Sequence, residues 1–194
     1  MEKIYEVPIG HPKIILTGFK PFFGDSINPS EVICQSIQIK NVIIRVLSVD
    51  FNLAFLELKE IIESEQPDFL IMLGIANGRL QICLEKVALN WNESKYPDEA
   101  GNYVEPSPIN PKKSDLALMT KFPINELQNY LDQKKHPVKM SFSAGTYVCN
   151  NLYYKVLSEF PELKALFIHV PSEKDLPMEN HIEIVKEILK YLMN

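Results

Sequence analysis

Five stretches of the chain consist mainly of apolar and β-branched residues, and this pattern predicts β-strands. They are residues 13–17 (KIILT), 41–49 (NVIIRVLSV), 68–73 (DFLIML), 137–142 (PVKMSF) and 164–170 (KALFIHV). Most of them are apolar at consecutive positions, which is typical of strands covered by helices on both faces of a sheet. A further stretch, residues 79–90 (RLQICLEKVALN), is compatible with an extended conformation.

Helical periodicity occupies the segments between these strands, and it predicts five helices. They are residues 29–37, 53–65, 124–133, 150–160 and 180–193. Strands that alternate with helices predict a three-layer α/β/α sandwich around a twisted, largely parallel sheet, with a mixed sheet left open. At about 150 residues per domain, the 194 residues predict a single domain over residues 1–194.

The segment 91–114 differs from the rest of the chain. It contains four of the 14 prolines and has little apolar periodicity. We expect a long ordered loop here, and long loops in compact domains are often functional.

Composition and charge narrow the classes of function. The net charge of −5 argues against nucleic-acid binding through bulk charge. The sequence contains no run of 18 apolar residues, so no membrane-spanning helix is expected. The first ten residues lack the apolar core of a signal peptide. Both observations favour the cytoplasm. The three cysteines and four histidines show no metal-ligand spacing, so neither a metal nor another cofactor is expected.

Cys149 is the first candidate for chemistry. It lies in SAGTYVCNN (143–151), after a predicted strand and near the start of a predicted helix, with Thr146 as the expected N-cap. The unpaired N–H groups of a helix start favour a thiolate and could hold an oxyanion. A small core residue at a strand–helix junction is the alternative.

His169 and Glu85 are candidates for a base and its orienting group. His169 lies one residue before the end of the last predicted strand, at the carboxyl edge where open α/β sheets place active sites. Glu85 shares strand parity with apolar neighbours, and a carboxylate in an apolar row needs a partner. Alternatively, His169 is a core histidine whose hydrogen bonds are satisfied, and Glu85 is half-exposed to water. Glu173 and Asp175 are rival orienting groups.

Two loops are candidate pocket walls. Phe19, Phe22 and Phe23 follow the first predicted strand, where aromatic residues either cap a core or bind a ligand, and Asn28 is expected to be an N-cap. The turn 74–79 (GIANGR) contains glycine but lacks a phosphate-binding motif.

Four blocks of the sequence, taken together, resemble the pyroglutamyl peptidase I family. They are ILTGFKPFFGDSINPS, GIANGRLQICLEKVALN, SFSAGTYVCNNL and FIHVP, in the same order, and YPDEAGN is also similar. The resemblance covers nearly the whole chain. It implies a cysteine peptidase that removes N-terminal 5-oxoproline (pyroglutamate) from peptides, needs no metal, and forms homo-oligomers.

The resemblance also implies roles for individual residues. Cys149 would be the nucleophile, His169 the general base and acid, and Glu85 the group that orients His169. Phe19 and Phe22 would enclose the pyrrolidone ring, and Asn28 would shape that loop. Lys95 stands where the family has an arginine and is a further substrate-binding candidate.

The departures from the family pattern keep other functions open. Phe23 replaces a usual glycine and adds bulk beside the expected pocket, and Lys95 is not equivalent to arginine at an anion-stabilising position. Ile75 and Asn77 also differ. A second hypothesis is therefore a catalytically weak or inactive member that acts as a binding or regulatory protein. A third is a thiol redox protein using Cys149, which the absence of a second cysteine nearby in sequence disfavours.

Overall fold

A computed structural model describes residues 10–194 of the chain. Residues 1–9, which carry most of the signal-peptide expectation, lie outside the described part. In chain order the elements are β1 (Ile14–Phe19), α1 (Pro29–Gln35), β2 (Val42–Leu47), α2 (Leu53–Glu65), β3 (Phe69–Ile75), β4 (Ile82–Glu85), β5 (Val87–Leu89), β6 (Ala117–Met119), α3 (Ile124–Gln133), β7 (Val138–Ser141), α4 (Val148–Glu159), β8 (Lys164–Val170) and α5 (Met178–Met193).

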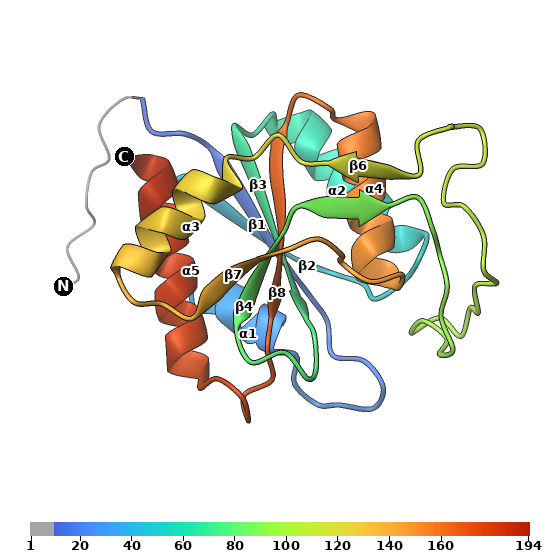
Figure 1. Ribbon diagram of the computed structural model, residues 1–194, viewed down its shortest axis with the longest axis horizontal. Helices are drawn as coiled ribbons and strands as arrows, with labels where there is room; N and C mark the ends of the chain where they lie inside the picture. Colours follow the sequence, from blue (N-terminus) through green and yellow to red (C-terminus); the bar gives the residue numbers. More distant parts are fainter. Residues whose placement is uncertain (1–9) are drawn as a thin grey trace.

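A six-stranded sheet in the order β2-β1-β3-β8-β4-β7 forms the centre of the molecule (Figure 1). The four strands β2, β1, β3 and β8 are parallel to one another. Strand β4 pairs antiparallel with β8 and parallel with β7, so β4 and β7 run in the opposite direction. The predicted α/β sandwich is confirmed, and its sheet is mixed.

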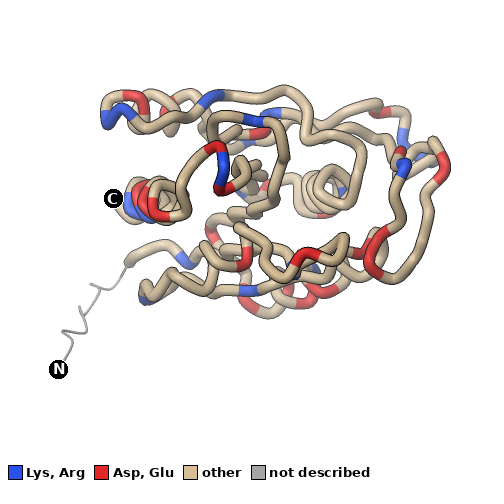
Figure 2. The backbone as a smooth tube through the Cα atoms, turned by 90° about the horizontal axis from the view of Figure 1, so that it is seen from below, with Lys and Arg blue, Asp and Glu red and all other residues tan. Residues whose placement is uncertain are grey.

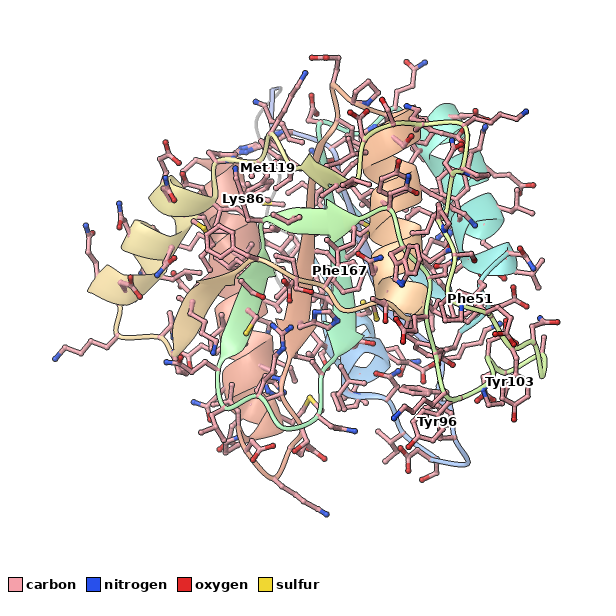
Figure 3. All side chains as sticks on the ribbon, turned by 45° about the vertical axis from the view of Figure 1, so that its right-hand side comes forward. Phe51, Lys86, Tyr96, Tyr103, Met119 and Phe167 are labelled. Carbon is pink, nitrogen blue, oxygen red and sulfur yellow. The ribbon has the colours of Figure 1, made fainter. Side chains whose placement is uncertain are left out.

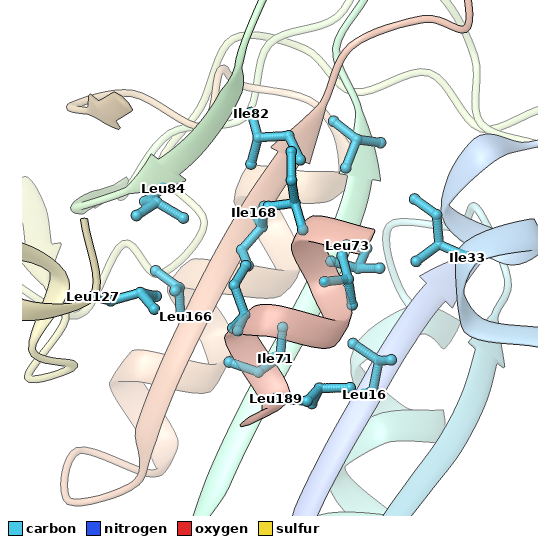
Figure 4. Close-up of a cluster of buried hydrophobic side chains, with 14 of the residues drawn as sticks. Leu16, Ile33, Ile71, Leu73, Ile82, Leu84, Leu127, Leu166, Ile168 and Leu189 are labelled. Carbon is cyan, nitrogen blue, oxygen red and sulfur yellow. The ribbon is translucent and has the colours of Figure 1, made fainter. Parts of the chain in front are cut away.

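Helices cover both faces of this sheet. Figure 1 shows α1, α3 and α5 on one side and α2 and α4 on the other. Ile71, Leu84 and Ile168 point to the first side and pack with Leu127 and Leu189 of its helices (Figure 4). The opposite face packs Leu70, Met72 and Phe167 against α2 and α4. Both faces are therefore apolar, as the consecutive apolar residues of the strands predict.

Most elements agree with the sequence pattern, and the exceptions have local causes. The stretch 79–90 is two strands, because the chain leaves the central sheet at Lys86 and β5 pairs antiparallel with β6 in a separate two-stranded sheet. Strand β6 is not predicted, because its three apolar residues (ALM) are too few to form a strand pattern and are mostly exposed. Helix α4 begins at Val148, two residues earlier than predicted, which makes Cys149 helical.

The segment 91–114 is an ordered loop, as predicted, and it packs against the end of the sheet. A β-bridge joins Asn92 to Ser107. The buried Asp98 carboxylate accepts a hydrogen bond from the backbone N–H of Phe51 (3.2 Å), and Tyr147 donates its hydroxyl hydrogen to the carbonyl of Pro97 (2.8 Å). Figure 3 shows Tyr96 and Tyr103 on this loop, far from Phe167 in the centre of the sheet.

Most charged residues lie around the outside of the molecule, and Asp50, Glu85 and Asp98 are buried. In Figure 2, Lys and Arg are interspersed with Asp and Glu along its outline. Within residues 10–194, no helix combines the length and the apolarity needed to cross a lipid bilayer.

His181 makes the stability of the fold sensitive to acid. It lies on α5, is fully buried, and neither ring nitrogen has a hydrogen-bond partner in the described part of the chain. Burial lowers the pKa of His181 from 6.5 to about 4. As pH falls through 6.5 the unfolded chain takes up a proton that the folded chain does not, so stability decreases.

We predict that His181→Leu removes this acid sensitivity. Between pH 7 and pH 5 the original chain should lose about 2 kcal/mol more unfolding free energy than the variant, since one pKa unit corresponds to about 1.4 kcal/mol. Urea unfolding of both proteins at the two pH values measures the difference. Equal losses in the two proteins would show that His181 is protonated as easily when folded as when unfolded.

Candidate active site

His169 and Glu85 form a buried pair in the middle of the sheet. His169 lies on β8 and Glu85 on the neighbouring antiparallel strand β4. Nδ1 of His169 is 2.7 Å from Oε1 of Glu85, Glu85 is fully buried and His169 is nearly so. Because a carboxylate only accepts hydrogen bonds, Nδ1 carries the hydrogen and Nε2 keeps its lone pair. This is the arrangement in which a carboxylate orients a histidine base.

The rival orienting groups lie elsewhere. Asp175 accepts a hydrogen bond from the hydroxyl of Ser172 (2.7 Å). Glu173 lines a surface hollow of about 550 Å³ together with Asn77 and Lys174. Within the described residues neither carboxylate is hydrogen-bonded to His169, so the structure favours Glu85.

Arg79 also contacts Glu85, and sequence reasoning missed it. It lies in the connection between β3 and β4, and its Nη1 donates to Oε1 of Glu85 (2.8 Å) and to the hydroxyl of Ser141 (3.2 Å). Its Nη2 donates to the backbone carbonyl of Ser143 (3.0 Å). The available signal was an arginine six residues before a carboxylate that was expected to need a partner.

Cys149 is the second residue of α4. The residue before the helix is Tyr147, whose side chain makes no capping hydrogen bond. The prediction that Thr146 is the N-cap is wrong, because its hydroxyl donates to the carbonyl of Glu93 in the long loop (2.7 Å). Cys149 still lies in the first helical turn, where the N–H groups lack partners within the helix.

Two asparagines fix the start of α4, and sequence reasoning did not single them out. The buried Asn150 side chain accepts from the N–H of Leu89 (2.8 Å) and donates to the carbonyls of Leu89 (2.9 Å) and Trp91 (3.0 Å). Asn151 donates to the side-chain oxygen of Asn92 (3.0 Å). These amides hold the helix beside β5, and two adjacent polar residues in an apolar helix were the signal.

In a largely parallel sheet, as predicted, Cys149 after β7 and His169 at the end of β8 would lie at the same edge of the sheet. This premise is wrong, because β7 and β8 run in opposite directions. The chain between β7 and α4 contains Gly145 with φ 79°, a left-handed conformation that glycine adopts without strain. The approach of the two side chains therefore depends on this connection and not on parallel strand ends.

Cys149 and His169 nevertheless lie on the same face of the sheet. Gly74 on β3 is the register partner of His169. A Cβ atom placed on Gly74 would be 2.9 Å from Sγ of Cys149, so the thiol lies directly over this glycine. Adjacent strands are about 4.8 Å apart, which brings the sulfur next to the imidazole. The ring of Phe167 fills the space below, 4.9 Å from the His169 ring.

Burial keeps both groups neutral in the free site. It raises the pKa of the Cys149 thiol to about 12, an effect that the charge of Glu85 increases and that of Arg79 reduces. Burial also lowers the pKa of His169, against the opposing effect of the hydrogen bond that Nδ1 donates to Glu85. Backbone hydrogen bonding at Cys149 does lower the thiol pKa, as expected for a helix start, but burial outweighs this effect. A neutral thiol needs a base to become a nucleophile, and Nε2 of His169 can act as one.

A small apolar pocket opens beside Cys149. It is lined by Phe19, Phe22, Asn28, Val49, Ile75, Tyr147, Val148 and Cys149. The predicted wall residues Phe19, Phe22 and Asn28 are thus brought together with the thiol. The lining is aromatic and aliphatic and includes no charged side chain, so the pocket suits a small uncharged group.

Asn28 shapes the loop that carries these aromatic residues. Its Oδ1 accepts from the N–H of Ser30 (3.0 Å), as expected for an N-cap, and its Nδ2 donates to the carbonyl of Lys20 (3.0 Å). Both ends of the amide therefore stabilise the turn from β1 to α1.

Phe23 and Lys95 do not line the pocket. Phe23 is half exposed, has φ 56°, and packs on Phe22, Tyr96 and Tyr147 with ring-centroid distances of 4.8, 5.3 and 6.2 Å. It therefore joins the β1–α1 loop to the long loop outside the pocket. Lys95 is exposed on the long loop, and the structure does not bring it to the thiol.

No group of three or more His, Cys, Asp or Glu side chains in residues 10–194 is arranged to hold a metal ion. The arrangement can instead support transfer of an acyl group to sulfur, with a thiol, an imidazole and an orienting carboxylate on one face.

We predict that Gly74→Ala disturbs the site. The new methyl group would lie 2.9 Å from both Sγ of Cys149 and the ring of Phe167, which is closer than van der Waals contact allows. Crowding a packed interior costs about 1–3 kcal/mol, and displacement of the thiol should change its rate of alkylation by iodoacetamide. Thermal unfolding and mass-spectrometric alkylation rates measure the two effects. An unchanged melting temperature together with an unchanged rate would contradict the proximity of Gly74 and Cys149.

Comparisons with known proteins agree with this geometry. The sequence model described as pyroglutamyl peptidase matches residues 12–183. A pyrrolidone-carboxylate peptidase of Thermosipho africanus is 33% identical over 91% of this chain and 93% of its own length. One from Thermococcus litoralis is 38% identical over 84% of this chain and 78% of its own length. The crystal structure of pyroglutamyl peptidase I from Bacillus amyloliquefaciens superposes with a TM-score of 0.85 at 29% identity, over 94% of this chain and 96% of that one. The chain belongs to the pyroglutamyl peptidase family of cysteine peptidases.

Proposed function

We propose that this chain hydrolyses the bond after an N-terminal pyroglutamyl residue of a peptide, with Cys149, His169 and Glu85 as its catalytic triad. The observation that carries the proposal is the buried Glu85–His169 hydrogen bond on the same sheet face as the thiol of Cys149. The apolar pocket beside the thiol supports a small cyclic amide as the group recognised.

The reaction begins with two neutral partners. Nε2 of His169 takes the proton of the Cys149 thiol as the sulfur attacks the carbonyl carbon of the pyroglutamyl residue. The hydrogen bond from Nδ1 to Glu85 holds the ring and stabilises the imidazolium that forms. Because burial disfavours both charged forms, transfer coupled to attack avoids a free thiolate.

The start of α4 supplies the countercharge for the oxyanion. The negative charge that develops on the carbonyl oxygen lies near the unpaired N–H groups of the first helical turn. His169 then gives its proton to the leaving amine, and a thioester to Cys149 remains. Activation of water by the same imidazole hydrolyses the thioester and releases pyroglutamate.

The pocket explains how a cyclised N-terminus is distinguished from a free one. A free peptide N-terminus is an ammonium group, and moving an unpaired charge into an apolar pocket costs several kcal/mol. The pyroglutamyl lactam carries no charge, and its ring can lie between Phe19 and Phe22. Recognition therefore rests on the absence of charge as well as on ring shape.

We also propose that the enzyme works in the cytoplasm on pyroglutamylated peptides and forms a homo-oligomer. Leu116, beside β6, is 85% exposed, and Met119, on β6, is 67% exposed. They offer apolar surface for contact between copies of the chain.

We predict that the chain releases aminomethylcoumarin from pyroglutamyl-aminomethylcoumarin. Cys149→Ala and His169→Ala should abolish the activity. The first removes the sulfur that attacks the substrate, and the second removes the base that takes the proton of the thiol. Glu85→Gln should lower kcat less, since the amide can still hold the ring but cannot stabilise its positive form.

The matched control is Cys34→Ala, which removes a buried thiol on the opposite face of the sheet. It should keep its activity once its folding is verified by circular dichroism. Equal rates in the original chain and in Cys149→Ala would contradict the cysteine peptidase hypothesis. A binding or regulatory protein would then be the better hypothesis.

A second prediction concerns the pocket wall. Phe22→Ala should raise KM about tenfold or more with a smaller effect on kcat, because about 1.4 kcal/mol of contact with the ring is lost. Tyr103→Ala, which removes an exposed aromatic residue from the long loop, serves as the control in the same steady-state assay. A KM that stays at the original value in Phe22→Ala would place the ring outside this pocket.

A further inference from the structure

We infer that Arg79 is a positioning residue of the site, whose guanidinium holds the carboxylate of Glu85 and joins it to the chain segment that leads to Cys149. The inference extends the proposed function, because it names a group that acts on the triad without touching the substrate.

The geometry of the guanidinium carries the inference. Nη1 lies 2.8 Å from Oε1 of Glu85, the same oxygen that is 2.7 Å from Nδ1 of His169. Nη2 donates to the backbone carbonyl of Ser143 (3.0 Å), two residues before Gly145. One planar group therefore contacts the carboxylate on β4 and the connection between β7 and α4. A lysine has no such fork of donors.

Charge balance gives Arg79 a second effect. Glu85 is fully buried, and its Oε2 has no hydrogen-bond partner in the described part of the chain. A buried carboxylate without a countercharge would take up a proton or keep one on its neighbour. With Arg79 in place, the Glu85 carboxylate has a countercharge 2.8 Å away, and His169 is neutral and able to act as a base. Without Arg79, His169 should retain its proton to higher pH, because the charge of Arg79 lowers the pKa of this imidazole.

The charges that act on the two reacting groups are the same. Within the described residues, Glu85 and Arg79 are the charged side chains that shift the pKa of Cys149 and of His169. For each of the two groups, the positive charge of Arg79 lowers the pKa. Loss of this charge should therefore raise the pKa of both Cys149 and His169, which loss of a purely structural contact would not do.

The test compares Arg79→Gln, Arg79→Lys and the control Arg45→Gln. Arg45 is the exposed arginine of β2 and is not one of the residues that line the pocket. The first readout is the pH dependence of Cys149 alkylation by iodoacetamide, followed by mass spectrometry. The second is the pH dependence of kcat/KM for pyroglutamyl-aminomethylcoumarin. Circular dichroism checks that each variant is folded.

In Arg79→Gln we expect the alkylation pKa to rise, because the charge that lowers it is lost, so alkylation at pH 7 should become slower. The acid limb of kcat/KM should shift to higher pH. Arg79→Lys keeps the charge but loses the fork, so its pH profiles should stay close to the original while kcat falls. Arg45→Gln should match the original chain in both readouts.

Folded Arg79→Gln with unshifted pH profiles in both readouts would overturn the inference and make Arg79 a structural residue only. If Arg79→Lys keeps the kcat of the original chain, the forked geometry of the guanidinium is not needed for catalysis. The alkylation readout needs no turnover, so it reports on Arg79 even if the chain fails to cleave the pyroglutamyl substrate. In that case the proposed function fails and the inference is judged by alkylation alone.

Discussion

A negative charge buried within the sheet is the constraint on which the site depends. Glu85 is fully buried beside apolar strands, where an isolated carboxylate would be too costly to keep ionised. His169 and Arg79 both donate to its Oε1, and together they make the charge tolerable. The contact with His169 also fixes the tautomer of the imidazole, so the hydrogen bond that stabilises the carboxylate also prepares the base.

The reversal of β4 makes these contacts available. Because β4 runs antiparallel to β8, Cys83 pairs with His169 and Glu85 pairs with Phe167, two residues earlier along β8. The carboxylate therefore lies beside the imidazole on the face covered by α4. The thiol reaches that face from the other side of His169, over Gly74, where any larger residue would occupy its space.

The sequence predicts the layers of the fold better than the geometry of its site. Apolar runs and helical periodicity locate the main strands and helices, and the bounds of α2 and α3 agree with the pattern to the residue. The direction of β7 is not encoded in its own residues, because it depends on how distant strands pair. The same limit applies to Arg79, whose contacts lie across a turn, and to the pKa of Cys149, which burial by the whole fold determines.

The position of β8 has a consequence for how the molecule is made. It is the last strand in the chain, yet it lies between β3 and β4 in the centre of the sheet. During synthesis the two flanking parts of the sheet have no common partner until residues 164–170 leave the ribosome. Such long-range pairing is slow to form. Until the central strand is inserted, the edges of β3 and β4 that pair with β8 have no partner, and unpaired strand edges are prone to aggregation.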